Sequence, residues 1–152
     1  MAKVLFVNPI VREEDVPRHV PYGMALLAAI ALREGHLVQV YDANAWRSND
    51  TTHRQVLEAD DWDVVALGGI PTAYGSIKNL IGLVEELALP AVCVLGGGVL
   101  TSLPREMMAW LGRVDVGVIG EAFETFPEIL TMVDAGRRDW SDIAGTISRR
   151  DD

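Results

Sequence analysis

One complete strand–helix–strand unit occupies residues 64–98, which read VVALGGIPTAYGSIKNLIGLVEELALPAVCVLGGG. The runs at 64–67 and 91–95 are short, apolar and closed by glycine, which is typical of strands buried on both faces of a parallel sheet. The segment 76–88 between them has its apolar residues at helical spacing. Two parallel strands need a crossover of this kind, so the stretch predicts an α/β domain.

The same alternation continues in both directions from this unit. Further strand-like runs lie at 4–7, 37–41 and 114–119, and further helical segments lie at 22–34, 52–59, 105–111 and 125–135. Such an alternation requires right-handed crossovers and predicts a doubly wound, mostly parallel five-stranded sheet with helices on both faces. We expect the flavodoxin-like (Rossmann-like) strand order 2-1-3-4-5.

Composition excludes several classes of protein. The 152 residues include 13 Lys and Arg against 22 Asp and Glu, giving a net charge of -9, which argues against a nucleic-acid partner because phosphate binding needs clustered basic residues. Cys93 is the single Cys and lies in an apolar run, so we expect a core residue rather than a disulfide, metal ligand or nucleophile. The apolar run near residue 4 is too short for a signal peptide or a membrane span. One soluble cytoplasmic domain without a membrane partner is expected.

Glycine is concentrated where the predicted strands end, which is where open parallel sheets bind their ligands. The residues concerned are Gly68 and Gly69 after the third strand, Gly96, Gly97 and Gly98 after the fourth, and Gly120, followed by Glu121, after the fifth. Glycine allows the tight turn that any strand-to-helix connection needs, and it also lets a flat group or another backbone approach closely. The third and fourth strands are neighbours in the expected order, and their glycine-rich ends carry no side chains. We therefore interpret the space at these ends as a slot.

The usual phosphate-binding patterns are absent. No G-x-x-x-x-G-K-[ST] run occurs, and the first strand leads into Asn8 and Pro9 rather than into a G-x-G-x-x-G turn or a pair of acidic residues. The three histidines share no metal-ligand spacing: we expect His36 to be a surface or cap residue and His53 to lie in a polar loop, while His19 lies in the long loop over the expected pocket.

Six segments, taken in order, resemble a known family. They are KVLFVNP at 3–9, PYGMALLAA at 21–29, REGH at 33–36, YDAN at 41–44, LGGGVLTSLP at 95–104 and IGEAFETFP at 119–127. Together they resemble the amino-terminal cobalamin (vitamin B12)-binding domain of cobalamin-dependent radical S-adenosylmethionine enzymes, over a span from Lys3 to about Arg150. The resemblance implies that the chain binds cobalamin.

The resemblance also implies a set of binding residues. In related folds the dimethylbenzimidazole tail of the cofactor lies between sheet and helices, against a Ser-x-Leu strand end and a later Gly-Gly; residues 68–70 take the first place and residues 96–97 the second. The cofactor-binding residues that this implies are Asn8, Pro9, Tyr22, Gly68, Gly69, Thr72, Tyr74, Gly96, Gly97, Gly98, Thr101, Gly120 and Glu121. Of these, Thr72, Tyr74 and Thr101 are expected to hydrogen-bond to the tail. No catalytic and no metal-ligating residue is assigned.

Two departures from the cobalamin-binding pattern shape these expectations. The Asp-x-His-x-x-Gly pattern that supplies an axial histidine in many cobalamin proteins is replaced here by Asn8-Pro9-Ile10-Val11-Arg12, which implies base-off binding without an axial histidine. His19 is then the remaining candidate for the lower face of the corrin. Gly68 stands where the family's Ser would donate a hydrogen bond to the tail.

The C-x-x-x-C-x-x-C triplet that holds the 4Fe-4S cluster and S-adenosylmethionine in these enzymes is missing. We therefore expect no catalysis from this chain alone. Residues 1–136 are expected to form the cobalamin-binding domain, and residues 137–152 an extension and the start of a linker. A radical S-adenosylmethionine catalytic domain, in cis or in trans, would hold the cluster in an enzyme of the methyltransferase or cyclase type.

Two other interpretations stay open. One is a flavodoxin-like interaction or substrate-recognition module that does not bind cobalamin, which the absent histidine and Gly68 favour. The other is a flavin or nucleotide binder, which rests on analogy of fold alone.

Overall fold

The predicted strands and helices are present, and their ends agree with the prediction to within a few residues. A computed structural model describes residues 1–14, 16–17 and 20–149. The strands in these residues are β1 (Lys3–Asn8), β2 (Leu37–Asp42), β3 (Val64–Gly68), β4 (Val92–Gly96), β5 (Val116–Val118) and β6 (Thr146–Ser148). The helices are α1 (Tyr22–Arg33), α2 (Ala43–Trp46), α3 (Asp50–Leu57), the 3-10 helix η1 (Pro71–Ala73), α4 (Tyr74–Glu86), α5 (Gly98–Ser102), α6 (Pro104–Trp110) and α7 (Thr125–Asp134). The sequence did not predict α2, η1, α5 or β6.

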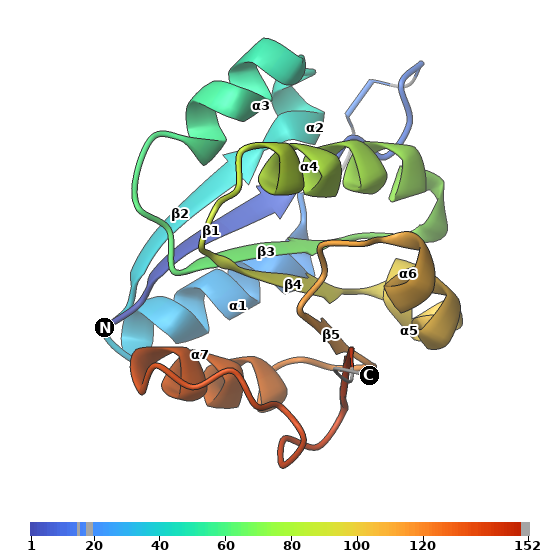
Figure 1. Ribbon diagram of the computed structural model, residues 1–152. Helices are drawn as coiled ribbons and strands as arrows, with labels where there is room; N and C mark the ends of the chain where they lie inside the picture. Colours follow the sequence, from blue (N-terminus) through green and yellow to red (C-terminus); the bar gives the residue numbers. More distant parts are fainter. Residues whose placement is uncertain (15, 18–19, 150–152) are drawn as a thin grey trace.

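Within the described residues the six strands form one sheet in the order β2-β1-β3-β4-β5-β6 (Figure 1). The pairs from β2 through β5 are all parallel, which confirms the predicted fold class and the relative order of these five strands, whereas the predicted number of five strands was wrong. β6 lengthens the sheet by one strand, which runs antiparallel to β5. No helix in the described part of the chain is long and apolar enough to cross a membrane.

Helices cover both faces of the sheet (Figure 1). α1 and α7 pack on one face, called here the α1/α7 face, while α3, α4 and α6 pack on the other, the α4 face. Successive strand residues point to opposite faces, so Phe6 belongs to the core of the α1/α7 face and its neighbours Leu5 and Val7 to the core of the α4 face. The sheet is therefore buried on both sides along its central strands.

β2 departs from the predicted burial. Leu37 and Val40 keep 47% and 46% of their surface exposed, whereas Tyr41 is buried. The prediction of a strand covered on both faces was wrong here, because β2 lies at the edge of the sheet. The apolar residues of β2 gave no sign of this edge position.

His36 and His53 lie in the core rather than at the surface. His36 is 8% exposed, and its Nδ1 accepts a hydrogen bond from the backbone N–H of Ala2 at 3.1 Å. His53 lies on α3, is 3% exposed, and has its Nδ1 2.8 Å from the hydroxyl of Tyr41. Burial lowers the pKa of His53, and the negative charge of Asp50 partly opposes that shift. The backbone N–H of His36 donates to the carbonyl of Ala31 at 3.1 Å, so His36 caps α1, as one of its two predicted roles has it. The predicted surface position of His36 and loop position of His53 were wrong, because both rings form hydrogen bonds to distant residues that a local pattern does not reveal.

The segment after α7 is packed onto the domain as far as β6. Trp140 and Ile143 are buried in the core of the α1/α7 face, and the hydroxyl of Thr146 donates to the carbonyl of Ile143 at 2.8 Å. These contacts bring residues 146–148 beside β5, where they form an added strand. The linker at the end of the chain stays a prediction, and residues 150–152 lie outside the described residues.

Candidate functional site

A cavity of about 570 Å³ lies at the carboxyl ends of the parallel strands, on the α1/α7 face. β1, β3, β4 and β5 supply its floor, and α1 and α7 supply Met24, Leu27 and Phe126 to its walls. This is the edge of the sheet at which open α/β folds place their ligands. The prediction of a ligand site at the strand ends therefore agrees with the position of this cavity.

The cavity floor is built in two rows, because side chains two residues apart along a strand share a face. Phe6, Ala66 and Val94 are register partners on β1, β3 and β4 and form an inner row of apolar side chains. Two residues further along, Gly68 and Gly96 pair in the next row, nearer the mouth. The floor is thus apolar at depth and bare of side chains toward the strand ends.

The glycines at these ends serve two different purposes. A Cβ on Gly97, whose φ is +80°, would lie 2.8 Å from the backbone N of Gly69, and a Cβ on Gly68 would lie 3.2 Å from the carbonyl O of Gly96. The backbone N–H of Val99 also donates to the carbonyl O of Gly69 at 2.8 Å. The two glycine-rich loops therefore close on each other, and the slot predicted between them is filled by backbone.

The open space lies instead beside Gly96 and Gly120. A Cβ added to either residue would meet no atom within 4 Å, and both residues line the cavity. The open space therefore lies on the α1/α7 face of the sheet and not between the two loops, where the slot was predicted.

Most of the predicted site residues come together around this cavity. Those that line it are Asn8, Tyr22, Gly68, Gly69, Gly96, Gly97, Gly98, Thr101, Gly120 and Glu121. Their role in binding remains a prediction.

Three of the predicted residues lie elsewhere. Pro9 is buried, with its Cγ 3.5 Å from the position of a Cβ on Gly69, and Thr72 is exposed in η1. Tyr74 packs against the core of the α4 face, and its ring makes an edge contact with Trp110 at a centroid separation of 6.3 Å. Tyr74 therefore points away from the cavity, because it begins α4, which covers the opposite face.

The inner, apolar part of the site was not predicted from the sequence. Phe6, Ala66, Val94, Val118 and Phe126 are all buried and all line the cavity. The rings of Phe6 and Phe126 lie 5.3 Å apart in a tilted arrangement. A usable signal was present, since each strand residue of this group stands two positions before a predicted site residue: Asn8, Gly68, Gly96 and Gly120.

The polar side chains at the mouth of the cavity form hydrogen bonds with neighbouring segments. The amide Nδ2 of Asn8 donates to Asp42 at 2.8 Å, which joins the ends of β1 and β2. The hydroxyl of Thr101 accepts a hydrogen bond from the backbone N–H of Gly120 at 3.0 Å, which joins α5, the helix after β4, to the end of β5. These bonds fix the strand ends relative to one another.

The loop after β1 is anchored at the same edge. The N–H of Ile10 donates to the hydroxyl of Ser76 at 2.9 Å, and the N–H of Val11 donates to the buried amide of Asn44 at 3.1 Å. The rim of the cavity carries the exposed apolar side chains of Tyr22, Ile70 and Phe123. His19, which the sequence places in this loop, lies outside the described residues.

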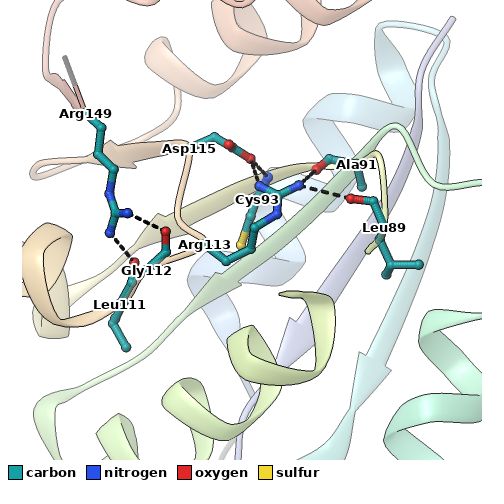
Figure 2. Close-up of polar contacts among 8 residues, drawn as sticks. All are labelled: Leu89, Ala91, Cys93, Leu111, Gly112, Arg113, Asp115 and Arg149. Atoms are coloured by element: carbon teal, nitrogen blue, oxygen red, sulfur yellow. Dashed lines mark hydrogen bonds and ion pairs between the residues drawn. The ribbon is translucent and has the colours of Figure 1, made fainter. Parts of the chain in front are cut away.

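A larger cavity, of about 1050 Å³, lies at the amino ends of β4 and β5. Several of its charged groups hold the fold together: Arg113 pairs with Asp115 and donates to the carbonyls of Leu89 and Ala91, at 3.0 and 2.8 Å (Figure 2). The guanidinium of Arg149 binds carbonyls at the end of α6, including that of Leu111 at 2.8 Å. This cavity is therefore a poorer candidate for a ligand site.

Cys93 lies beside this charged cluster, and its backbone N–H donates to Asp115 at 2.7 Å (Figure 2). Its thiol is fully buried, and burial, with a smaller contribution from Asp115, raises its pKa to about 12. The prediction of a core cysteine is confirmed. Among the described residues, no three His, Cys, Asp or Glu side chains are grouped so that they could hold a metal ion.

The fold and the cavity together define a Rossmann-like ligand-binding domain, with an apolar cavity where its parallel strands end. A family model described as the B12 binding domain matches residues 10–130. The chain belongs to this family. The match confirms the resemblance drawn from the sequence.

Several solved structures share the fold. The radical S-adenosylmethionine methyltransferase TsrM from Kitasatospora setae superimposes with a TM-score of 0.84 at 23% identity, over 99% of this chain and 29% of that one. The cobalamin-dependent S-adenosylmethionine radical enzyme OxsB gives a TM-score of 0.80 at 15% identity, over 99% of this chain and 21% of that one.

The monomethylamine corrinoid protein of Methanosarcina barkeri gives a TM-score of 0.56 at 15% identity, over 86% of this chain and 57% of that one. The chain thus spans less than a third of the length of the two radical enzymes. Among curated proteins none matches its sequence.

Proposed function

We propose that this domain binds cobalamin, with the nucleotide tail of the cofactor in the cavity on the α1/α7 face and the corrin across its mouth. The observation that carries the proposal is the open space beside Gly96 and Gly120, directly next to an apolar inner row. A flat aromatic base suits such a space, because bare residues allow its face to approach the backbone and apolar side chains surround its edge. The residues present therefore fit the cofactor that the family binds.

The chain's own groups would orient the cofactor. The hydroxyl of Thr101 accepts from Gly120 and keeps its own hydrogen available for an oxygen of the tail. Tyr22, which is 72% exposed, and Phe123 offer apolar surface at the mouth for the corrin. Bound cobalamin would supply a cobalt centre able to carry a methyl group or an electron.

We further propose that the cofactor is held base-off and without a histidine from the protein. His36 accepts from Ala2, before the start of β1 and so at the opposite end of the sheet, and His53 contacts Tyr41 on the α4 face. Neither of these histidines lines the cavity. Their positions support a lower face of cobalt without the imidazole of either residue; His19, the third histidine, lies outside the described residues.

The domain is proposed to serve a radical S-adenosylmethionine catalytic domain, in cis or in trans, of the methyltransferase or cyclase type. The likeness to TsrM and OxsB over 99% of this chain supports this role. The 4Fe-4S cluster and S-adenosylmethionine would be held by that catalytic domain, because Cys93 is the single Cys of the chain and is buried.

Cobalamin binding is tested with a variant that blocks the cavity. Gly96→Phe places a ring in the open space, and we expect it to weaken the binding of hydroxocobalamin about tenfold or more. Gly82→Phe is the matched control, because Gly82 lies exposed on α4, away from the cavity, and also has no atom within 4 Å of an added Cβ.

Both variants are mixed with hydroxocobalamin and passed through gel filtration, and retained cofactor is measured by its absorbance. Retention by the wild type and by Gly82→Phe, together with loss in Gly96→Phe, supports the proposal. A colourless wild-type protein would overturn it and favour the interaction or substrate-recognition module instead.

A further inference from the structure

The inner row of the cavity offers no hydrogen-bonding side chain. Phe6, Ala66 and Val94 on the sheet, with Val118 and Phe126, are at most 6% exposed. The strand backbone between them is already paired, since β1, β3 and β4 hydrogen-bond to one another along these positions. A ligand group that reaches the inner row would therefore contact only hydrocarbon side chains.

The polar side chains of the cavity lining lie nearer the mouth. Asn8 is buried but stands one row beyond Phe6, and one N–H of its amide donates to Asp42. Thr101 and Glu121 are exposed at the carboxyl ends of the strands. In the described part of the lining, hydrogen-bonding side chains are therefore confined to the mouth.

This division bears on which lower base the cavity accepts. An apolar base, such as a dimethylated benzimidazole or a cresol, can turn a hydrocarbon edge toward the inner row. A purine such as adenine carries an exocyclic amine, and a buried donor without a partner is costly. We propose that the cavity selects corrinoids by their lower base and favours an apolar aromatic base over a purine. This inference rests on the proposed binding of the nucleotide tail.

Four corrinoids separate the contribution of the lower base to binding from that of the rest of the cofactor. Cobalamin and cresolyl cobamide carry apolar bases, adeninyl cobamide carries the amine, and cobinamide has no base. Dimethylbenzimidazole and adenine can both coordinate cobalt in the free corrinoid, whereas the cresol base cannot. Cobalamin is therefore the comparison in which the adeninyl form does not alone bear the work of detaching its base. We expect adeninyl cobamide to bind about tenfold or more weakly than both cobalamin and cresolyl cobamide, as measured by titration calorimetry with the wild-type chain.

A matched pair of variants tests the inner row itself. Val94→Thr exchanges a methyl group for a hydroxyl at nearly the same shape. We expect it to reduce the difference in binding affinity, called here the gap, between the cresolyl and adeninyl forms. Val40→Thr makes the same exchange on exposed β2, outside the cavity, and should leave the gap unchanged. Circular dichroism of each variant verifies that the fold is retained.

Each outcome has a definite meaning. Equal binding of the cresolyl and adeninyl forms, both tighter than cobinamide, would overturn the selectivity and leave the proposed function intact. Equal binding of all four would show that the base lies outside the cavity, and would overturn both the selectivity and the proposed position of the nucleotide tail, while corrinoid binding itself would stand. If no corrinoid bound at all, the proposed function itself would fall.

Discussion

Gly96 and Gly97 are neighbours in the chain with opposite requirements for space. Gly97 has a φ of +80° and faces the backbone of Gly69, whereas Gly96 has an ordinary φ and faces open space. The first glycine is required by the fold, and the second leaves room for a ligand. Substitution by alanine separates these two roles.

Gly97→Ala is expected to lower the free energy of unfolding by about 2–4 kcal/mol, because the left-handed conformation and the overlap with Gly69 add to each other. Gly96→Ala is expected to change it by at most about 1 kcal/mol. Urea unfolding followed by circular dichroism measures both. A Gly97→Ala protein as stable as the wild type would contradict the close approach of the two loops.

These glycines also show where sequence reasoning reaches its limit. The clusters at 68–69 and 96–98 correctly marked the edge of the sheet at which the cavity lies. A run of glycines does not reveal which member touches backbone and which faces space, because that depends on how two distant loops pack. Tyr74 was misplaced for the same reason, since the face of the sheet that α4 covers decides where its first residue points.

At the scale of elements, one charged side chain contributes to holding β6. Arg149 comes directly after β6, and its guanidinium donates to the carbonyls of Leu111 and Gly112 (Figure 2). It also donates to the carbonyl of Met108. The carbonyls at the end of a helix have no partner within the helix, and a cation placed there is favourable. Arg149 thereby fastens the end of β6 to the end of α6.

Arg149→Ala is expected to lower the free energy of unfolding by about 1–2 kcal/mol and to speed amide hydrogen exchange in residues 146–148. Arg149→Lys keeps the charge but loses the planar fork, and should recover only part of the effect. Arg138→Ala is the control, since Arg138 is exposed and, among the described residues, its guanidinium donates to the carbonyl of its neighbour Arg137. Unchanged exchange in Arg149→Ala would contradict the role of this contact.

The elements that the sequence predicted well have a clear local pattern. α1, α4 and α7 have long periodic patterns, and the central strands are continuous apolar runs; the ends of all these elements agree to within two residues. β6 has only Thr146–Ser148 and owes its place to Trp140, Ile143 and Arg149, which lie outside the strand. A three-residue strand held by flanking contacts has no periodic signal to detect.

At the scale of the whole molecule, the sheet separates two cores that differ in what they do. The core of the α4 face is filled by α3, α4 and α6, whereas the core of the α1/α7 face opens into the cavity. The segment before β6 also supports the cavity wall: the N–H of Ile119 donates to the carbonyl of Gly145 at 2.8 Å, and the hydroxyl of Thr125 donates to that of Ala144 at 3.2 Å. Ligand binding should therefore reduce the local motion of the α1/α7 face and of this segment.

Hydrogen exchange with and without cobalamin tests this asymmetry. We expect slower exchange on binding in residues 21–27, 96–101 and 118–126, which line the cavity, and in residues 144–146, which brace its wall. Exchange in α3, which contacts α4 far from the cavity, should change only by the global stabilisation, about 2.7 kcal/mol at a cofactor concentration one hundred times the Kd. Protection centred on α3 or on the edge of β2 would place the ligand on the wrong face and contradict the assignment of the cavity. Protection of the cavity loops without residues 144–146 would show that the wall closes around the cofactor independently of β6.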